Sequence, residues 1–273
     1  MNAESQAAAL RWRAQGMAAV VVHVVRTQGS APRDAGTRML VAPHTVLGTI
    51  GGGHLELQAI ADARTLLAGG QVARQQHIAL GPSLGQCCGG ALDLHFGLLA
   101  ESDPATWPLD APLFTLQLYG AGHVGRAIVQ LLAGLPCQVQ WIDEREDEFP
   151  PGALPAHIRK ICVEPVQAEV ALAPPGACYL VLTHSHDLDL AISHAVLQRG
   201  DFGFFGLIGS RTKRARFEHR LRGRGVSDAQ LARMVCPIGL PGIPGKAPEL
   251  MAVAVVAQLL QVAAAQNPAV DTP

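Results

Sequence analysis

Two adjacent cysteines, Cys87 and Cys88, lie in the glycine-rich segment GQCCGG at residues 85–90. Neighbouring cysteines seldom form a disulfide with each other, because the required geometry is strained. Structural cysteines are typical of strands and helices, whereas this segment is too rich in glycine for the interior of either. A thiolate in such a loop suits a soft metal ligand or a persulfide carrier. The alternative is two small, inert side chains in a turn.

A second motif, GAGHVG at residues 120–125, follows an apolar strand and opens a helix. Gly120, Gly122 and Gly125 fit the pattern G-x-G-x-x-G, and Asp143 ends the next predicted strand, 18 residues after Gly125. Such glycines let a diphosphate approach a helix N-terminus, and the acid can hold a ribose hydroxyl. The combination predicts a Rossmann-type domain. NAD is one candidate occupant, and a different ligand in the same crevice is the other.

The segment THSHDLD at residues 183–189 brings together two imidazoles and two carboxylates directly after a predicted strand. His184, His186 and Asp187 together resemble a divalent-metal site. Alternatively, these polar side chains line the crevice or cap the next helix, with Asp187 as the N-cap residue. Both interpretations place the segment at the carboxyl end of a strand, where α/β folds bind ligands.

Two further glycine-rich loops occur in the first half, GSAPR at residues 29–33 and GTIGGGHLE at residues 48–56. Backbone N–H groups at Gly51, Gly52 and Gly53 could form an anion-binding nest before a helix. Arg33 could add a bidentate contact to a phosphate. Turn formation alone is the competing explanation.

A basic helix start, GSRTKR at residues 209–214, favours an anionic partner or simply a solvated basic face. Cys236 is a secondary thiol candidate, ranked below the adjacent pair because a lone cysteine beside proline more often packs in a core. Cys137, Cys162 and Cys178 are interpreted as core or strand residues.

Hydrophobic patterning organises these motifs into two halves. The expected elements are strands at 17–26, 37–42, 46–50, 72–80 and 91–99 with a helix from 53, then a linker at 101–112, strands at 113–119, 139–142, 178–183 and 204–208, and helices at 123–132 and 248–261. Strands alternating with helices indicate a parallel sheet. The fold class is therefore α/β, with an N-terminal α+β domain (1–108) followed by a C-terminal Rossmann-like doubly wound parallel sheet (109–273).

Composition excludes several classes of protein. The 273 residues are 49% hydrophobic and 16% charged, with a net charge of −1, which excludes disorder and argues against nucleic-acid binding. No apolar run reaches the ~20 residues that span a bilayer, so we expect no membrane segment. Six cysteines in this pattern do not resemble a secreted disulfide framework, which predicts a cytoplasmic protein with reduced thiols. The apolar surplus favours a homodimer.

Taken together, the motifs resemble the XdhC/CoxI family of molybdoenzyme accessory proteins. The resemblance rests on eight segments in order, namely QGSAPRDAGTRMLV, GTIGGGHLE, GQCCGG, YGAGHVGRAIVQLL, WIDERE, THSHDLD, GLIGSRTKRARF and CPIGLPGIPGKAPELMAVAVVAQLL. It implies a chaperone, not an enzyme, that binds molybdenum cofactor (molybdopterin) while a cysteine desulfurase replaces an oxo ligand by a sulfido ligand. It also implies a second partner, apo-xanthine dehydrogenase, into which the cofactor is inserted.

On this hypothesis, Cys87 or Cys88 contacts the molybdenum or the transferred sulfur. The pterin and its phosphate would be held by the remaining candidates, Arg33, Gly51, Gly52, Gly53, Gly120, Gly122, Gly125, Asp143, His184 and His186. An NAD-dependent oxidoreductase is the alternative function, but it leaves GQCCGG unexplained. A metal-dependent hydrolase explains THSHDLD and little else.

Overall fold

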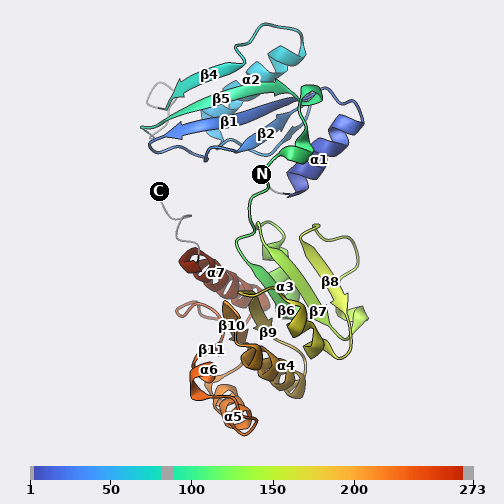
Figure 1. Cartoon of the computed structure of the whole chain (residues 1–273), viewed down its shortest axis with the longest axis vertical. Coiled ribbons are helices and arrows are strands. Elements are labelled where there is room, and N and C mark those ends of the chain that lie inside the picture. Colours follow the sequence, from blue (N-terminus) through green and yellow to red (C-terminus); the bar gives the residue numbers. More distant parts are fainter. Residues whose placement is uncertain (1–2, 81–88, 267–273) are drawn as a thin grey trace. The chain divides into compact units, whose positions relative to one another are not determined.

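The computed structural model describes residues 3–80 and 89–266, and its chain divides into two compact units between Asp110 and Ala111 (Figure 1). Each unit has its own sheet and its own buried apolar clusters. Cys87 and Cys88 lie outside the described residues.

The N-terminal unit is an antiparallel sheet flanked by two helices. Its elements are α1 (Ala3–Ala14), β1 (Val20–Gln28), β2 (Arg38–Val41), β3 (Val46–Leu47), α2 (Gly53–Leu67), β4 (Gln75–Ala79), β5 (Ala91–Leu98) and the 3₁₀ turns η2 (Leu99–Glu101) and η3 (Pro104–Thr106). Within the described ranges the strands are ordered β3-β2-β1-β5-β4, and neighbouring strands pair antiparallel.

Successive side chains of β1 point to opposite faces of this sheet, and each face packs against one of the two helices. Val20, Val22 and Val24 belong to the apolar cluster that contains Leu55 of α2. Val21 points to the opposite face and belongs to the cluster that contains Ala9 of α1. Because side chains alternate along a strand, β1 thereby forms a core with a helix on either side of the sheet.

The C-terminal unit is a parallel sheet with helices on both faces. Its elements are β6 (Thr115–Tyr119), α3 (His123–Leu132), β7 (Gln138–Asp143), η4 (Glu146–Glu148), β8 (Ile158–Cys162), η5 (Val166–Leu172), β9 (Cys178–Val181), α4 (His186–Arg199), β10 (Phe204–Leu207), α5 (Arg211–Arg222), α6 (Asp228–Ala232), β11 (Met234–Val235) and α7 (Pro248–Gln266). The strand order is β11-β10-β9-β6-β7-β8, with every printed pair parallel. Counted within this sheet, that is the order 3-2-1-4-5-6 of the Rossmann fold.

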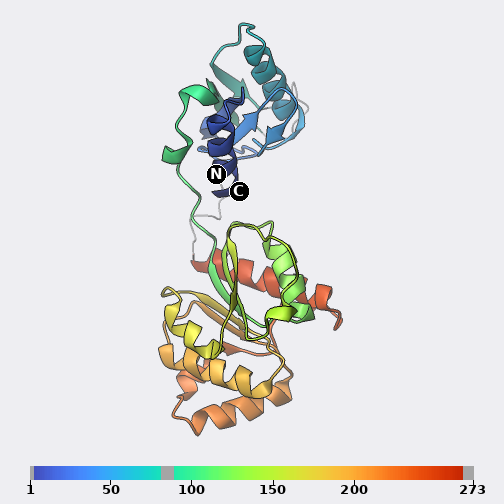
Figure 2. The same ribbon diagram turned by 90° about the vertical axis from the view of Figure 1, so that its right-hand side faces the viewer.

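Helices α3 and α7 lie side by side on one face of the parallel sheet, and Figure 2 shows them together. Residues of α4, α5 and α6 pack with the opposite face. The central strands are buried on both faces, which explains why their sequences are continuous apolar runs and not alternating ones.

Helix α7 extends five residues beyond the predicted end at 261 and, at 19 residues, is long and apolar enough to cross a membrane by length and composition. Ala252, Val255 and Leu259 are nevertheless buried in the cluster shared with α3. One face of α7 thus packs into the core of this unit, whereas Leu250 and Val253 are exposed.

The predicted fold class is confirmed, and most strand boundaries differ from the prediction by one to three residues. The elements that were not predicted include α1, the edge strand β8 and the two-residue strand β11.

Candidate functional site

The glycine motif of the C-terminal unit lies where the strand order of the parallel sheet reverses. Gly120 follows β6, and Leu182 follows the adjacent strand β9. The helix after β6 packs on one face of the sheet and the helix after β9 on the other. Ligands of open α/β sheets bind in the crevice at such a switch point, outside the carboxyl ends of the strands.

The three glycines of this motif have different structural roles. Gly120 has a φ of +121°, and a Cβ there would lie 2.3 Å from the carbonyl oxygen of Leu182. A Cβ on Gly125 would lie 2.1 Å from the carbonyl oxygen of Gly120, so this glycine allows close packing of helix on strand. At Gly122, by contrast, a Cβ would meet no heavy atom of the described residues within 4 Å.

Gly122 is also the N-cap residue of α3, and no side chain in the described ranges caps this helix by a hydrogen bond. A helix N-terminus carries partial positive charge and unpaired N–H groups. The open side of Gly122 therefore gives an anionic group direct access to the start of α3.

The side chain of Asp143, at the end of β7, makes hydrogen bonds to other residues of the protein. Its carboxylate accepts hydrogen bonds from the backbone N–H of Ala121 (2.7 Å) and from the backbone N, Nε and NH2 of Arg145 (each 3.0 Å). Burial tends to raise the pKa of Asp143, but these hydrogen bonds and the Arg145 charge outweigh it and hold the pKa below its ordinary value. The visible role of this carboxylate is to fix the glycine turn, and it has little capacity left for a ribose hydroxyl.

The segment after β9 is organised by Ser185 and Asp189. Ser185 is the N-cap of α4 and accepts from the backbone N–H of Leu188, so the prediction of Asp187 as N-cap is wrong. The buried carboxylate of Asp189 accepts from Thr183 N (3.0 Å) and Oγ1 (2.7 Å) and pairs with Lys213 Nζ at 2.5 Å. The segment thus closes on itself around a buried ion pair.

The proposed metal ligands of this segment have separate partners. His184 Nε2 lies 3.6 Å from a carboxylate oxygen of Glu144, and the ring of His186 packs edge-on against Phe217. Asp187 is exposed and pairs with an arginine of α5. Among the described residues, no group of three or more His, Cys, Asp or Glu side chains is placed to hold a metal ion. The structure therefore gives the metal-hydrolase hypothesis no support in these ranges.

Most of the basic side chains at the start of α5 pair with other residues of the protein. Lys213 also donates to the carbonyl of Ile208 (2.8 Å), and its side chain is only 12% exposed. Arg214 pairs with Glu218 one turn later at 2.8 Å. Arg211 remains exposed as the part of this segment that faces solvent.

In the N-terminal unit, the predicted anion nest before α2 is filled by the protein's own carboxylate. Glu56 accepts from the backbone N–H of Ile50 (2.9 Å) and Gly52 (3.0 Å) and from the hydroxyl of Thr49. Burial would raise the pKa of Glu56, but these hydrogen bonds together lower it. Gly51 to Gly53 all have positive φ, and the N–H of Gly51 donates to the Thr49 hydroxyl at 3.0 Å.

Three loops of this unit pack against one another, and we call them the loop cluster (residues 28–33, 48–53 and 89–90). A Cβ on Gly51 would lie 2.4 Å from Cβ of Pro32, and one on Gly90 would lie 2.4 Å from the carbonyl oxygens of Gln28 and Ser30. Arg33 lies in this cluster and is exposed. The cluster brings together the described ends of three separately predicted motifs, and the segment that carries Cys87 and Cys88 enters it at Gly89.

The four described cysteines are poor sources of thiolate. Burial raises the pKa of Cys137 and of Cys178 to about 12. Burial also raises the pKa of Cys236, against the opposing charge of the nearby basic residues. Cys162, predicted as a core or strand residue, is the exposed last residue of β8, and its pKa is raised by desolvation and neighbouring carboxylates.

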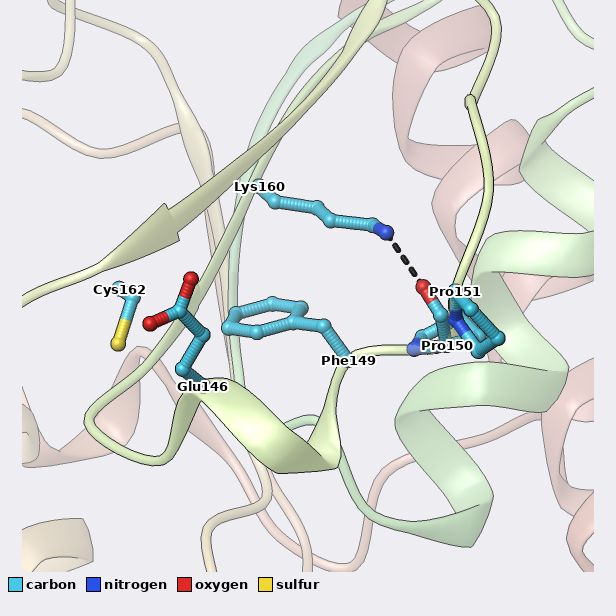
Figure 3. A pocket seen from close by; sticks show the side chains of 6 residues that line it. All are labelled: Glu146, Phe149, Pro150, Pro151, Lys160 and Cys162. Atoms are coloured by element: carbon cyan, nitrogen blue, oxygen red, sulfur yellow. Dashed lines mark hydrogen bonds between the residues drawn. The ribbon is translucent and has the colours of Figure 1, made fainter.

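Sequence reasoning missed a pocket of about 390 Å³ between η4 and the edge strand β8 (Figure 3). The ring of Phe149 forms its floor, with the Glu146 carboxylate and Cys162 at one end and Lys160 at the other. Lys160 Nζ donates to the carbonyls of Pro150 (2.5 Å) and Gly152 (3.2 Å). The aromatic residue and proline pair in EFPPG were the signal for it. An aromatic floor between opposite charges suits a planar, polar ring.

Comparison with known proteins identifies relatives of both units. The pattern of the XdhC Rossmann domain matches residues 116–259, and that of the XdhC and CoxI family matches residues 12–77. The uncharacterized protein YqeB of Escherichia coli (strain K12) is 29% identical over 271 residues, covering 96% of this chain and 46% of YqeB. The chain thus spans about half the length of this curated relative.

A solved structure described as a xanthine dehydrogenase from Bacillus halodurans resembles this chain with a TM-score of 0.74. The match covers 99% of this chain and 98% of the other, at 19% identity. At that level of identity the likeness shows a shared fold.

Proposed function

The chain belongs to the XdhC/CoxI family, and from that premise we propose that it is a molybdenum-cofactor chaperone. It binds the cofactor, holds it while a cysteine desulfurase replaces an oxo ligand by a sulfido ligand, and assists its insertion into apo-xanthine dehydrogenase. In this role the protein is an accessory factor and turns over no substrate of its own.

The observation that carries the proposal is the open start of α3. The cofactor is an anion whose pterin bears a phosphate, and Gly122 leaves the N-terminus of this helix accessible at the switch point of the sheet. Gly120 and Gly125 shape the turn, and Asp143 and Arg145 hold it from the side. The backbone N–H groups at the start of α3 bind and orient the phosphate end of the cargo, and Asp143 keeps the glycine turn in place.

Sulfur chemistry needs a thiolate, and we assign it to Cys87 and Cys88. Soft thiolate ligands suit molybdenum and transferred sulfur. The raised pKa values of the four described thiols disfavour them as alternatives. We also assign His184 and His186 to the cargo, because they follow Leu182, whose carbonyl oxygen lies against Gly120.

The alternative function, an NAD-dependent oxidoreductase, is favoured by the Rossmann strand order. It is disfavoured by Asp143, whose carboxylate already accepts hydrogen bonds from Ala121 and Arg145 instead of being free for a ribose. A fluorescence titration with NADH distinguishes the two functions, because only the oxidoreductase requires nicotinamide binding.

Cofactor capture tests the proposal directly. The purified protein is mixed with molybdenum cofactor released from a donor enzyme and desalted, and molybdenum and oxidised pterin are then quantified in the protein fraction. Stoichiometric retention that is lost in the Cys87→Ala/Cys88→Ala variant supports a carrier that uses the thiol pair. Cys162→Ala is the matched control, because it removes an exposed thiol outside that pair.

Retention that is unchanged in the double variant keeps the carrier function and moves the contact to the glycine loops. Absence of any retention contradicts the proposal. A cytoplasmic location and a homodimer remain predictions, and sedimentation at micromolar concentration tests the dimer.

A further inference from the structure

The N-terminal sheet carries a row of cationic and imidazole side chains that the proposed function does not use. His23 on β1 is directly opposite Arg38 on β2 and His95 on β5. These three residues, the Arg38–His23–His95 row, lie on the face opposite α2, because Val22 and Val24 on either side of His23 point toward α2.

Helix α1 covers only one end of this face. The apolar cluster beneath α1 includes Val21 and Leu40. On their strands these residues are the next ones on the same face as His23 and Arg38, two residues away in each case. Trp107 lies at the border, with its ring centroid 5.4 Å from Cζ of Arg38. Gln6 of α1 fixes this tryptophan's turn by donating to its carbonyl oxygen at 3.1 Å.

Arg38 is held in place without a carboxylate partner. Its NH1 donates to the carbonyl of Gly36 at 2.9 Å, and within the described ranges no salt bridge involves it. Its guanidinium is partly buried, which lowers the pKa of Arg38. Arg26 on the same sheet differs, because it pairs with Asp93 at 2.8 Å. The guanidinium of Arg38 is thus partly buried beside the Trp107 ring, and among the described residues only the Gly36 carbonyl accepts a hydrogen bond from it. Such a guanidinium is suited to bind an oxyanion.

The imidazoles beside it strengthen this arrangement. Burial, then the charge of Arg38, then His95 lower the pKa of His23 to about 4, so its ring is neutral at pH 7. Asp93, two residues before His95 on the same face, is already shared by Arg26 and His77. A neutral imidazole beside a cation donates one N–H to a bound anion.

We propose that Arg38, His23 and His95 form a binding site for an oxyanion, either a phosphate or a carboxylate, on the face of the N-terminal sheet that α1 leaves uncovered. Arg38 supplies the charge and the fork of donors, Trp107 supports the guanidinium plane, and the two imidazoles add directional hydrogen bonds. The site shares no residue with the α3 turn or with the loop cluster, and its existence does not depend on the cofactor function.

Nuclear magnetic resonance of the imidazole protons in the full chain tests the proposal. Inorganic phosphate or acetate is titrated at constant ionic strength, and the shifts and pKa values of His23 and His95 are followed. A bound anion stabilises the imidazolium, so the pKa of His23 should rise on saturation. If phosphate but not acetate shifts the proton signals of both rings, the natural ligand is phosphorylated. If acetate shifts them equally, the ligand is the carboxylate of a protein partner.

Arg38→Gln should weaken binding by about tenfold or more, since charged hydrogen bonds are lost. Arg26→Gln is the matched control, because it removes the same charge from the same sheet at a paired position and should leave affinity within about twofold. Arg38→Lys keeps the charge without the fork and should give an intermediate loss. The proposal is overturned if neither anion moves His23 or His95, or if both glutamine variants weaken binding equally.

Discussion

The different roles of the glycines in the α3 turn predict opposite outcomes for two similar substitutions. Gly122→Ala should leave the fold intact and impair cofactor capture, whereas Gly120→Ala should destabilise the C-terminal unit. Both changes add one methyl group within the same turn. Only the surroundings of the new Cβ differ.

The expected magnitudes follow from the geometry. Gly122 has φ −72° and ψ −172°, which any residue adopts, so its replacement should change the free energy of unfolding by less than about 1 kcal/mol. At Gly120, a φ of +121° costs a non-glycine residue about 1–3 kcal/mol. The contact of 2.3 Å with the Leu182 carbonyl adds about 1–3 kcal/mol of overpacking. At about 2–4 °C per kcal/mol, Gly120→Ala should lower Tm by roughly 5–20 °C.

For capture, the new methyl group at Gly122 stands where the phosphate approaches the helix. Loss of one charged hydrogen bond, about 1.5–3 kcal/mol, should weaken affinity by about tenfold to a hundredfold. Urea denaturation and the desalting assay are measured on the same preparations. The reasoning is refuted if Gly122→Ala captures cofactor like wild type, or if it destabilises the protein as much as Gly120→Ala.

Two further predictions concern internal carboxylates. Glu56→Gln should lower the free energy of unfolding by about 1 kcal/mol at pH 7, a modest value because the carboxylate is partly solvated. Since the pKa of Glu56 is depressed in the folded state, this contribution is present above the ordinary value of 4.5 and is lost as the pH falls through the folded value. Wild type and variant should therefore converge in urea denaturation as the pH falls below the folded-state pKa, and a constant difference would contradict the role of the charge. Lys213→Met should cost about 3 kcal/mol by leaving the buried charge of Asp189 without its cation, and adding Asp189→Asn should recover much of that loss in thermal denaturation. Additive losses in the double variant would show that the pair is not coupled.

The sequence predicted the C-terminal unit well because its signals are local. The strands at the centre of the sheet are continuous apolar runs, and the helix after GAGHVG begins and ends where predicted, at His123 and Leu132. Strand β8 was not predicted because Arg159 and Lys160 interrupt its apolar pattern, and an edge strand tolerates such charged residues. Helix α1 escaped because its alanine-rich sequence has no clear apolar stripe.

Site residues were harder to predict because a sequence motif identifies polar side chains without showing which residues they contact in the fold. Asp143 has the spacing of a ribose ligand, but Arg145 two residues later occupies its carboxylate. The spacing of His184 and His186 suggested a shared metal, but one ring meets a glutamate and the other a phenylalanine. That glutamate directly follows β7 and that phenylalanine lies in α5, both far away in the sequence from the two histidines, and only the fold brings them near.

The two glycine-rich helix starts illustrate the same limit. Both Gly51–Gly53 before α2 and Gly120–Gly125 before α3 were predicted as places for the phosphate. In the structure, the carboxylate of Glu56 already accepts hydrogen bonds from the backbone before α2, so a phosphate there would have to displace an internal anion. At α3 the carboxylate of Asp143 accepts from one amide of the turn, that of Ala121, and from Arg145, and Gly122 stays open. For this reason the proposed function places the phosphate of the cargo at α3 and not before α2.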